Sequence, residues 1–351
     1  MTSSRPSEPE TGAPHGDEEL EDRLSHPTAQ AVEALRATPG DLMVIGAGGK
    51  MGPSLTAMAQ RAAAAIGDGR RVMAVSRWGN VADAARLEGM GVHIIRADLL
   101  EPDAFEALPD APNIVFMIGQ KFGTSAAPAL TWMTNTVIPS RAVARYRNSR
   151  FVTFSTGNVY PLTRADGTGA QEEDALAPVG EYAATCVGRE RVFEDAAQRW
   201  GTHSVLLRLN YAVDLRYGVL VDIARRLLGG APIDLAMGYL NCIWQGDANA
   251  LALAALPLAS APPFALNLTG AERLSVRAVA EELGRRLGCT PQFAGTEGGD
   301  ALLSDTRRLQ ARVGHPAVGA STLMAWVADW LRAGGRTLGK ATRFERRDGS
   351  F

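Results

Sequence analysis

The strongest constraint on the fold is a glycine-rich turn that directly follows a short apolar run. The run "LMVIGAG" begins at Leu42, and Gly46, Gly49 and Gly52 stand at the spacing GxxGxxG. Glycines let such a turn approach a pyrophosphate, and the next helix offers free N–H groups and a positive dipole end. The segment therefore predicts a strand, a dinucleotide-binding turn and a helix, and a merely structural turn is the alternative.

Short apolar runs alternate with amphipathic stretches through this half of the chain. The further runs are "RVMAVSR", "VHIIRADL", "NIVFMIG", "RFVTFST" and "SVLLRLN". The alternation predicts an α/β fold with a Rossmann-type, doubly wound parallel sheet over residues 41–208. Over residues 209–335 the pattern loosens into helices closed by glycine and the run "FALNLTG". This part predicts a smaller, substrate-capping lobe that returns one strand to the sheet.

The two terminal segments have a different composition. Residues 1–40 are rich in Pro, Ser, Glu and Gly, which predicts a disordered acidic extension with at most a short helix near "TAQAVEALRA". Residues 336–351 are charged and predict a mobile tail.

Charge and composition exclude several classes of function. The net charge of -2 argues against a nucleic-acid partner, because phosphate binding needs a basic surplus. No apolar run is long enough to span a bilayer, and the acidic start lacks the apolar segment of a secretory signal, so we expect a cytoplasmic protein. Isolated cysteines and unpaired histidines predict neither a disulfide framework nor a metal site.

The end of the second predicted strand bears on the choice of cofactor. Enzymes that use NAD usually carry an acidic residue there, whereas this chain has Ser76 and Arg77. An arginine can bind a 2′-phosphate, and Lys50 in the glycine turn adds positive charge, so the sequence favours NADP, with NAD as the alternative. The predicted cofactor-binding residues are Gly46, Gly49, Lys50, Met51, Gly52, Ser76, Arg77, Asp98 and Leu99.

From about Leu42 to Leu331 the chain resembles the extended short-chain dehydrogenase/reductase family, also called the NAD-dependent epimerase/dehydratase family. "FVTFSTGNVYP" resembles its "SSxxVYG" motif, "TWMTNTVIPSRAV" its fourth helix, and "LLRLNYAV" its "RxxNVYGP" segment. "CIWQGDANALAL", "FALNLTGAERLSVRAVAEEL" and "SDTRRLQARVGHPAVGASTLMAWVADWL" resemble its later segments. These motifs occur in the family's order.

The resemblance implies a set of catalytic residues and one departure from the family pattern. Tyr182 matches the tyrosine that transfers a proton, Thr156 the hydroxyl that hydrogen-bonds the reacting oxygen, and Asn135 the positioning asparagine. The family's lysine, four residues after the tyrosine, is replaced by Cys186. That lysine lowers the pKa of a tyrosine from about 10, because a nearby cation favours the phenolate. A cysteine cannot do this.

Three interpretations of this replacement stay open. In the first, another cation substitutes, and Lys121 is the candidate because the only other lysines are Lys50 in the turn and Lys340 in the tail. An ordinary solvated loop lysine is equally consistent with Lys121. In the second, Tyr182 acts as a neutral acid. In the third, redox chemistry is lost and the fold senses a dinucleotide.

The predicted substrate is a small, polyhydroxylated molecule, either carbohydrate-like or a sugar nucleotide. Its candidate contacts are Asn210, Arg216 for an anionic group, and Trp244, for which core packing is the alternative. The function predicted is an NAD(P)-dependent epimerase, dehydratase or reductase. The alternatives are a non-catalytic dinucleotide sensor, or a lyase or isomerase without hydride transfer. The resemblance also implies a homodimer formed through the helices that contain Asn135 and Tyr182.

Overall fold

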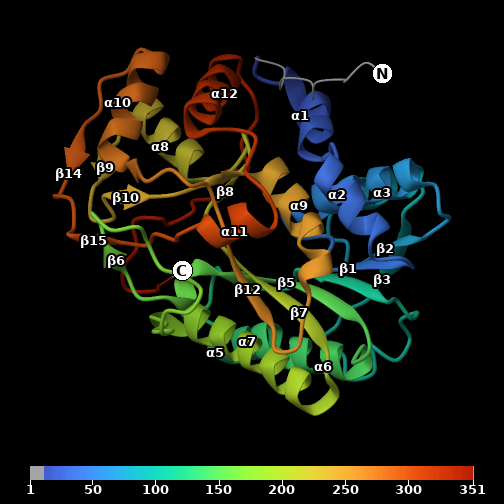
Figure 1. Cartoon of the computed structure of the whole chain (residues 1–351). Helices are drawn as coiled ribbons and strands as arrows, with labels where there is room; N and C mark the ends of the chain where they lie inside the picture. Colours follow the sequence, from blue (N-terminus) through green and yellow to red (C-terminus); the bar gives the residue numbers. More distant parts are fainter. Residues whose placement is uncertain (1–11, 351) are drawn as a thin grey trace.

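Seven parallel strands form the central sheet of the computed structural model, which describes residues 12–350 (Figure 1). The strands are β1 (Leu42–Ile45), β2 (Val72–Ser76), β3 (His93–Arg96), β4 (Asn113–Phe116), β5 (Arg150–Thr156), β7 (His203–Leu209) and β12 (Phe264–Leu268). Every pairing between them is parallel, and their order is β12-β7-β5-β4-β1-β2-β3. The predicted Rossmann-type sheet with a returning strand is confirmed.

The order of the strands reverses between β1 and β4, which lie side by side in the sheet. The chain proceeds from β1 outward to β3, and then crosses back to β4 and continues to the opposite edge. In open parallel sheets, ligands bind outside the carboxyl ends of the strands at such a reversal. The expected place for a site is therefore the edge next to Ile45 and Phe116.

Helices cover both faces of the sheet. One face packs on α2 (Ala29–Arg36), α3 (Gly52–Ile66), α4 (Val81–Gly89) and α9 (Gln245–Ala254), and the other on α6 (Ile138–Arg145) and α7 (Gly180–Trp200) (Figure 1). Successive strand residues point to opposite faces, so Val115 belongs to the first layer and Ile114 and Phe116 to the second. Burial on both faces explains why the strands are continuous apolar runs.

The lobe has a core of its own, built from α8 (Val219–Leu228), α10 (Val276–Leu287) and α12 (Ala320–Arg332). Its smaller elements are β8 (Ala212–Val213), β9 (Ile233–Asp234), β10 (Tyr239–Leu240), β11 (Ile243–Trp244), η3 (Leu256–Leu258), β13 (Leu274–Ser275), β14 (Phe293–Ala294), β15 (Asp300–Ala301) and α11 (Arg307–Arg312). Helix α9 belongs to the lobe by sequence but packs on the sheet, so the two parts share one continuous interior. The division at residue 208 stays a prediction.

The prediction of a disordered N-terminal extension is wrong for its described part. Residues 16–24 form α1 (Gly16–Leu24), and α2 begins at an N-cap, Thr28, whose hydroxyl accepts a hydrogen bond from the backbone N–H of Ala31 (3.2 Å). Leu20 and Leu24 are buried in the core of the lobe, whereas Leu35 is buried against the sheet. These few leucines are enough to hold the two short helices against the rest of the protein, because they lie on one face of each helix. Residues 1–11 lie outside the described part.

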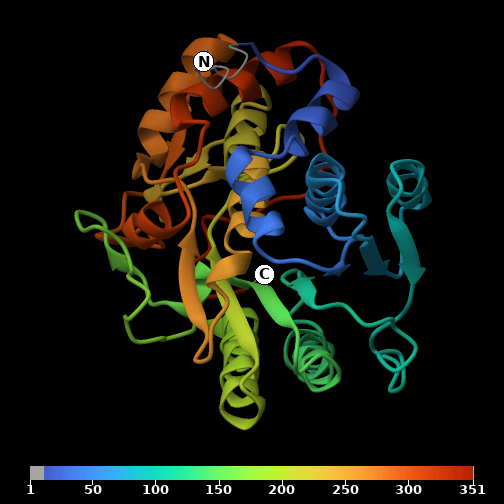
Figure 2. The same ribbon diagram turned by 45° about the vertical axis from the view of Figure 1, so that its right-hand side comes forward.

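The C-terminal segment, predicted to be mobile, runs back over the lobe. Phe344 is buried in its core, and the backbone N–H of Thr342 donates to the Asp222 carboxylate (2.6 Å). The end of the chain lies in the middle of the molecule in both views (Figures 1 and 2). None of the helices formed within residues 12–350 is long and apolar enough to cross a membrane.

We expect Leu35→Ala to lower the free energy of unfolding by about 2–5 kcal/mol, because it leaves a cavity where α2 meets the sheet. Leu228→Ala is the matched control, since Leu228 is 51% exposed, and we expect a change within about 0.5 kcal/mol. Urea unfolding followed by circular dichroism measures both. Equal effects of the two substitutions would show that α2 is not part of the folded core.

Candidate dinucleotide and catalytic site

The glycine turn approaches its neighbours too closely for most side chains. A Cβ on Gly52 would lie 2.3 Å from the carbonyl O of Ala47, and one on Gly46, where φ is +92°, would lie 2.8 Å from the backbone N of Ile118. Gly48 was not singled out by the GxxGxxG spacing, yet a Cβ there would lie 2.5 Å from Ser76 Oγ. Close packing therefore requires these three glycines of the turn.

A cavity of about 580 Å³ opens over this turn at the reversal point between β1 and β4. Of the predicted cofactor-binding residues, Gly46, Gly49, Ser76, Arg77, Asp98 and Leu99 line it. The far wall is the loop after β4, residues 117–120. The cavity has the size and position expected for a dinucleotide site.

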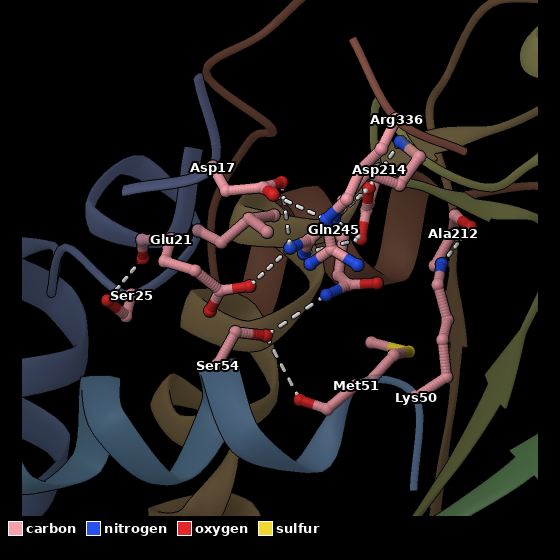
Figure 3. Close-up of polar contacts among 12 residues, drawn as sticks. Asp17, Glu21, Ser25, Lys50, Met51, Ser54, Ala212, Asp214, Gln245 and Arg336 are labelled. Carbon is pink, nitrogen blue, oxygen red and sulfur yellow. Dashed lines mark hydrogen bonds and ion pairs between the residues drawn. The ribbon is translucent and has the colours of Figure 1, made fainter. Parts of the chain in front are cut away.

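Three of the predicted cofactor residues, Lys50, Met51 and Gly52, do not line this cavity. The carbonyl O of Met51 accepts a hydrogen bond from Ser54 Oγ (3.0 Å), which fixes the first turn of α3. Lys50 extends toward the lobe, where its Nζ donates to the carbonyl O of Ala212 (3.3 Å) and lies 4.5 Å from the centre of the Tyr217 ring (Figure 3). The residue as a whole is exposed, but desolvation of its ammonium group by these neighbours lowers the pKa of Lys50 to about 8.

Arg77 is well placed to meet a ligand. Its side chain is 72% exposed at the rim of the cavity, and its nearest carboxylate, Asp98, lies 3.9 Å away. The next residue, Trp78, has a φ of +53° and donates from Nε1 to the carbonyl O of Ile95 (3.1 Å). This anchored ring holds the backbone beside Arg77 in place while leaving the guanidinium open to an anion.

Tyr182 lies in the first turn of α7 and Thr156 at the carboxyl end of β5. Burial raises the pKa of Tyr182 above its ordinary value, the neighbouring Cys186 raises it further, and a hydrogen bond with Thr156 acts in the opposite direction. Thr156 Oγ1 also accepts from the side-chain amide of Asn158 (2.9 Å). At neutral pH the phenol of Tyr182 is therefore protonated and can donate its proton.

Asn135 joins three elements through one fully buried amide. It lies in a π-helical turn, η1 (Met133–Val137), between α5 (Pro128–Trp132) and α6. Its Oδ1 accepts from the backbone N–H of Gln120 (2.8 Å), and its Nδ2 donates to the carbonyl O of Gln120 (3.0 Å) and to Thr185 Oγ1 (2.9 Å). Asn135 thus fixes the loop after β4 against α7 and is a positioning residue.

Lys121 follows Gln120 in the same loop and reaches the tyrosine. Its Nζ lies 5.8 Å from the centre of the Tyr182 ring, 5.9 Å from that of Tyr211 and 5.8 Å from that of Phe122. These distances allow cation–π attraction. Burial lowers the pKa of Lys121 to about 8, so its ammonium is still mostly charged at pH 7.

Cys186 itself contributes no charge. Its thiol is buried, and burial raises its pKa, so the neutral thiol is the form present at physiological pH. The side chain packs in a small cluster with Val159, Tyr160 and Ala170, and Tyr182 lies against the same cluster. The cysteine therefore behaves as a small apolar residue in place of a lysine.

A second cation near the tyrosine, Arg189, was not predicted. It is buried and donates to the carbonyl O of Phe154 (2.6 Å) and to the backbone O (3.3 Å) and Oδ1 (3.0 Å) of Asn135. Within residues 12–350 no carboxylate forms an ion pair with it, and its positive charge lowers the pKa of Tyr182. Arg189 follows Tyr182 by seven residues, or two helical turns, and this spacing could have predicted that both side chains lie on the same face of the helix.

The three predicted substrate contacts are engaged inside the protein. Asn210 Nδ2 donates to Ser304 Oγ (2.9 Å), and Trp244 packs edge-to-face on Trp326 in the lobe core, with ring centres 5.4 Å apart. Arg216 forms ion pairs with Asp214 (3.0 Å) and with Glu21 of α1 (2.7 Å). Arg216 therefore ties the N-terminal helix to the lobe, and carboxylates already balance its charge.

A second cavity of about 580 Å³ adjoins the first over the glycine turn and extends toward the lobe. Its basic lining residues are Lys50, Arg216, Arg336 and Lys340, and its acidic ones are Glu21, Asp83 and Asp214. Figure 3 shows part of this wall, where Asp17 and Glu21 of α1 face Asp214 and Arg336, and Gln245 donates to Ser54 Oγ (3.0 Å). No cluster of metal-binding side chains occurs among the described residues, 12–350.

Comparison with known proteins agrees with this geometry. Residues 42–213 match the sequence model of the NAD dependent epimerase/dehydratase family. The chain carries the domain of this family. The family comprises NAD-dependent enzymes, so the prediction of an enzyme of this class is confirmed at the level of the family. None of the curated proteins compared with the chain matches it.

Several solved structures share the fold at low sequence identity. MoeE5 in complex with UDP-glucose and NAD is 21% identical, with a TM-score of 0.66 over 84% of this chain and 99% of that one. UDP-glucuronic acid 4-epimerase from Bacillus cereus in complex with NAD is 17% identical, with a TM-score of 0.67 over 83% and 96%. UDP-glucose 4-epimerase from Thermus thermophilus, in complex with NAD, is 20% identical, with a TM-score of 0.65 over 83% and 99%. These neighbours extend the family fold beyond residue 213 into the lobe.

The chain has only three lysines, which makes the state of Lys121 directly measurable. After reductive ¹³C-methylation, we expect the signals of Lys50 and Lys121 to titrate near pH 8, because neighbouring protein groups partly desolvate both ammonium groups. Lys50→Arg and Lys121→Arg assign the two signals. A midpoint for Lys121 near 10.5, the ordinary value, would mean that its ammonium is hydrated and lies away from the tyrosine.

Proposed function

We propose that the chain is an NAD(P)-dependent oxidoreductase of the epimerase/dehydratase type that acts on a hydroxyl or carbonyl group of a carbohydrate-like substrate. The observation that carries this proposal is the group of Tyr182, Thr156 and Lys121, of which Lys121 directly follows Gln120 in the wall of the dinucleotide cavity. The NAD and UDP-sugars bound to the structural neighbours support a nicotinamide dinucleotide and a carbohydrate-like substrate, either free or joined to a nucleotide.

The chemistry divides between the cofactor and the side chains. A bound nicotinamide would supply or accept the hydride. In the direction of reduction, the carbonyl oxygen gains the proton of the Tyr182 hydroxyl, while Thr156 hydrogen-bonds the same oxygen. The raised pKa of Tyr182 suits this direction, because the proton donor is present at neutral pH.

The reverse direction needs the phenolate, and two cations favour it. Lys121 lies beside the Tyr182 ring, and Arg189 is buried on α7, the helix that also carries Tyr182. A positive charge near a phenol stabilises its ionised form, and its effect grows where water is excluded. We therefore assign to Lys121, supported by Arg189, the electrostatic role that the lysine of the motif has in the family. Lys121 can fill it below its pKa of about 8.

The rim of the first cavity favours NADP. Arg77 is exposed at the place where a ribose 2′-substituent is expected, and the chain lacks the carboxylate that would repel a phosphate there. Asp98, at 3.9 Å, neutralises part of the charge, which leaves NAD as the alternative. A homodimer and a cytoplasmic location remain predictions.

A neutral cysteine at position 186 and a raised tyrosine pKa favour one alternative, a protein that binds the dinucleotide without turnover. The retained pair of Tyr182 and Thr156 argues for catalysis. A lyase or isomerase that never transfers a hydride would keep this pair as well.

We expect Tyr182→Phe to lower kcat for NAD(P)H-linked carbonyl reduction by about 10²–10⁴-fold, because the proton donor is lost while the ring still packs. Reduction of a panel of sugars and keto-sugars is followed by loss of NAD(P)H absorbance, with retained cofactor binding as the control for folding. Full activity of Tyr182→Phe would refute the assigned mechanism. Cofactor binding without turnover of any substrate by the unaltered protein would favour the sensor.

Arg77→Asp should shift the ratio of the Kd values for NADPH and NADH toward NADH by about tenfold or more, since it replaces a phosphate-binding cation with a carboxylate. Fluorescence titration of the bound nicotinamide measures both constants. Arg96→Asp is the control for added negative charge, because Arg96 ends β3 and does not line the cavity. An unchanged ratio would remove Arg77 from the cofactor site.

A further inference from the structure

The C-terminal segment follows a defined path from the glycine turn to the catalytic helix. After α12 it passes the second cavity, where the backbone N–H of Leu338 donates to the carbonyl O of Arg216 (2.9 Å). Thr342 and Phe344 then anchor it to the lobe, and Glu345 pairs with Arg226 (3.1 Å). The segment therefore stays attached to the lobe as far as residue 345.

Beyond this point the segment crosses from the lobe to the dinucleotide-binding domain. Arg347 pairs with Asp300 and donates to the carbonyl O atoms of Ala236 and Asp300 (both 3.0 Å). Gly349 then lies directly on the peptide that joins Val179 to Gly180, and a Cβ on Gly349 would come within 2.1 Å of the carbonyl O of Val179. The end of the segment thus packs on Val179 and Gly180, at the start of α7, and we call this contact its seat. The first turn of the same helix carries Tyr182.

This crossing leaves little free space between the C-terminal segment, the loop after β5 and the lobe. The cavity there has about 30 Å³ and is lined by Asn158, Tyr160 and Leu162, by Met237 and Leu302 of the lobe, and by residues of the C-terminal segment. It reaches the catalytic region, because Asn158 donates to Thr156. About 30 Å³ is the share of one water molecule, whereas pockets for drug-sized ligands have roughly 300–1,000 Å³.

We propose that residues 346–350 form a specificity barrier that closes the substrate cleft to nucleotide-sized groups between the loop after β5 and the lobe, so that the substrate is a compact polyhydroxylated compound without a nucleotide. The inference rests on the proposed function for the chemistry, and it narrows the substrate class. It separates this chain from neighbours in complex with UDP-glucose or UDP-glucuronic acid. Room for a compact substrate remains in the second cavity, beside Gly119 and Phe122 of the loop that carries Lys121.

Two glycines of the segment provide a matched pair of variants. Both have positive φ, +70° at Gly349 and +64° at Gly339, so a valine strains the backbone equally at either position. Gly349→Val also collides with Val179, whereas nothing lies within 4 Å of a Cβ on Gly339. Only Gly349→Val should lift the end of the chain from its seat.

The first measurement is trypsin cleavage after Arg346 and Arg347, which reports seating without any assay of turnover. We expect about tenfold faster cleavage in Gly349→Val than in the unaltered protein or Gly339→Val. The second is calorimetric titration with UDP-glucose in the presence of NADPH. We expect Gly349→Val to bind UDP-glucose at least about tenfold more tightly than the other two proteins, which should show Kd values above about 1 mM.

Several outcomes would overturn the proposal. One is tight binding of UDP-glucose by the unaltered protein. Another is a Gly349→Val protein that releases its end to trypsin and gains no affinity. If cleavage does not change, the double variant Arg347→Ala/Gly349→Val removes the second anchor, and failure of that variant to gain affinity refutes the barrier. Trypsin cleavage and UDP-glucose binding do not require hydride transfer. The barrier can therefore fail its test while the proposed activity stands, and the reverse.

Discussion

The buried amide of Asn135 holds together the parts of the structure on which the site depends. Its hydrogen bonds with both backbone groups of Gln120 fix the loop after β4, and its bond with Thr185 fixes the same loop to α7. Lys121 and Tyr182 lie on these two elements, so their approach follows from this contact. An unsatisfied buried amide would cost about 1–3 kcal/mol, which makes any other arrangement of the loop unfavourable. A π-helical turn directs this side chain inward.

The electrostatics of the site rest on a balance between burial and two cations. Burial removes Tyr182 from water and opposes ionisation, and the replacement of a lysine by Cys186 removes the charge that the family places closest to it. Two other residues restore positive charge near Tyr182: Lys121 from the loop after β4, and Arg189 from α7, the helix that carries Tyr182. Carbonyl oxygens accept hydrogen bonds from the Arg189 guanidinium, which explains how a buried cation is tolerated there.

Both terminal segments add contacts that the central sheet does not require. Helix α1 buries its leucines in the lobe and α2 buries Leu35 against the sheet, so this extension joins the two parts. The ion pairs of Arg216 with Glu21 and Asp214 reinforce the same junction in a partly desolvated place, where such pairs matter more than on the surface. The C-terminal segment joins the two parts a second time, through Arg347 on the lobe and Gly349 at the start of α7.

The sequence by itself determined the fold class, the glycine turn and the family, because these depend on local periodicity and on spacing within one strand, turn and helix. It also placed Lys121 on the correct loop and left its role open. The tertiary structure decided which distant groups meet. Arg189 reaches Asn135 only because α7 packs on the π-helical turn, and Arg216 pairs with Glu21 only because α1 folds over the lobe. Composition predicted disorder in the terminal segments because it averages over all residues of a segment. Burial depends instead on the few apolar side chains that lie on one face of a helix or turn.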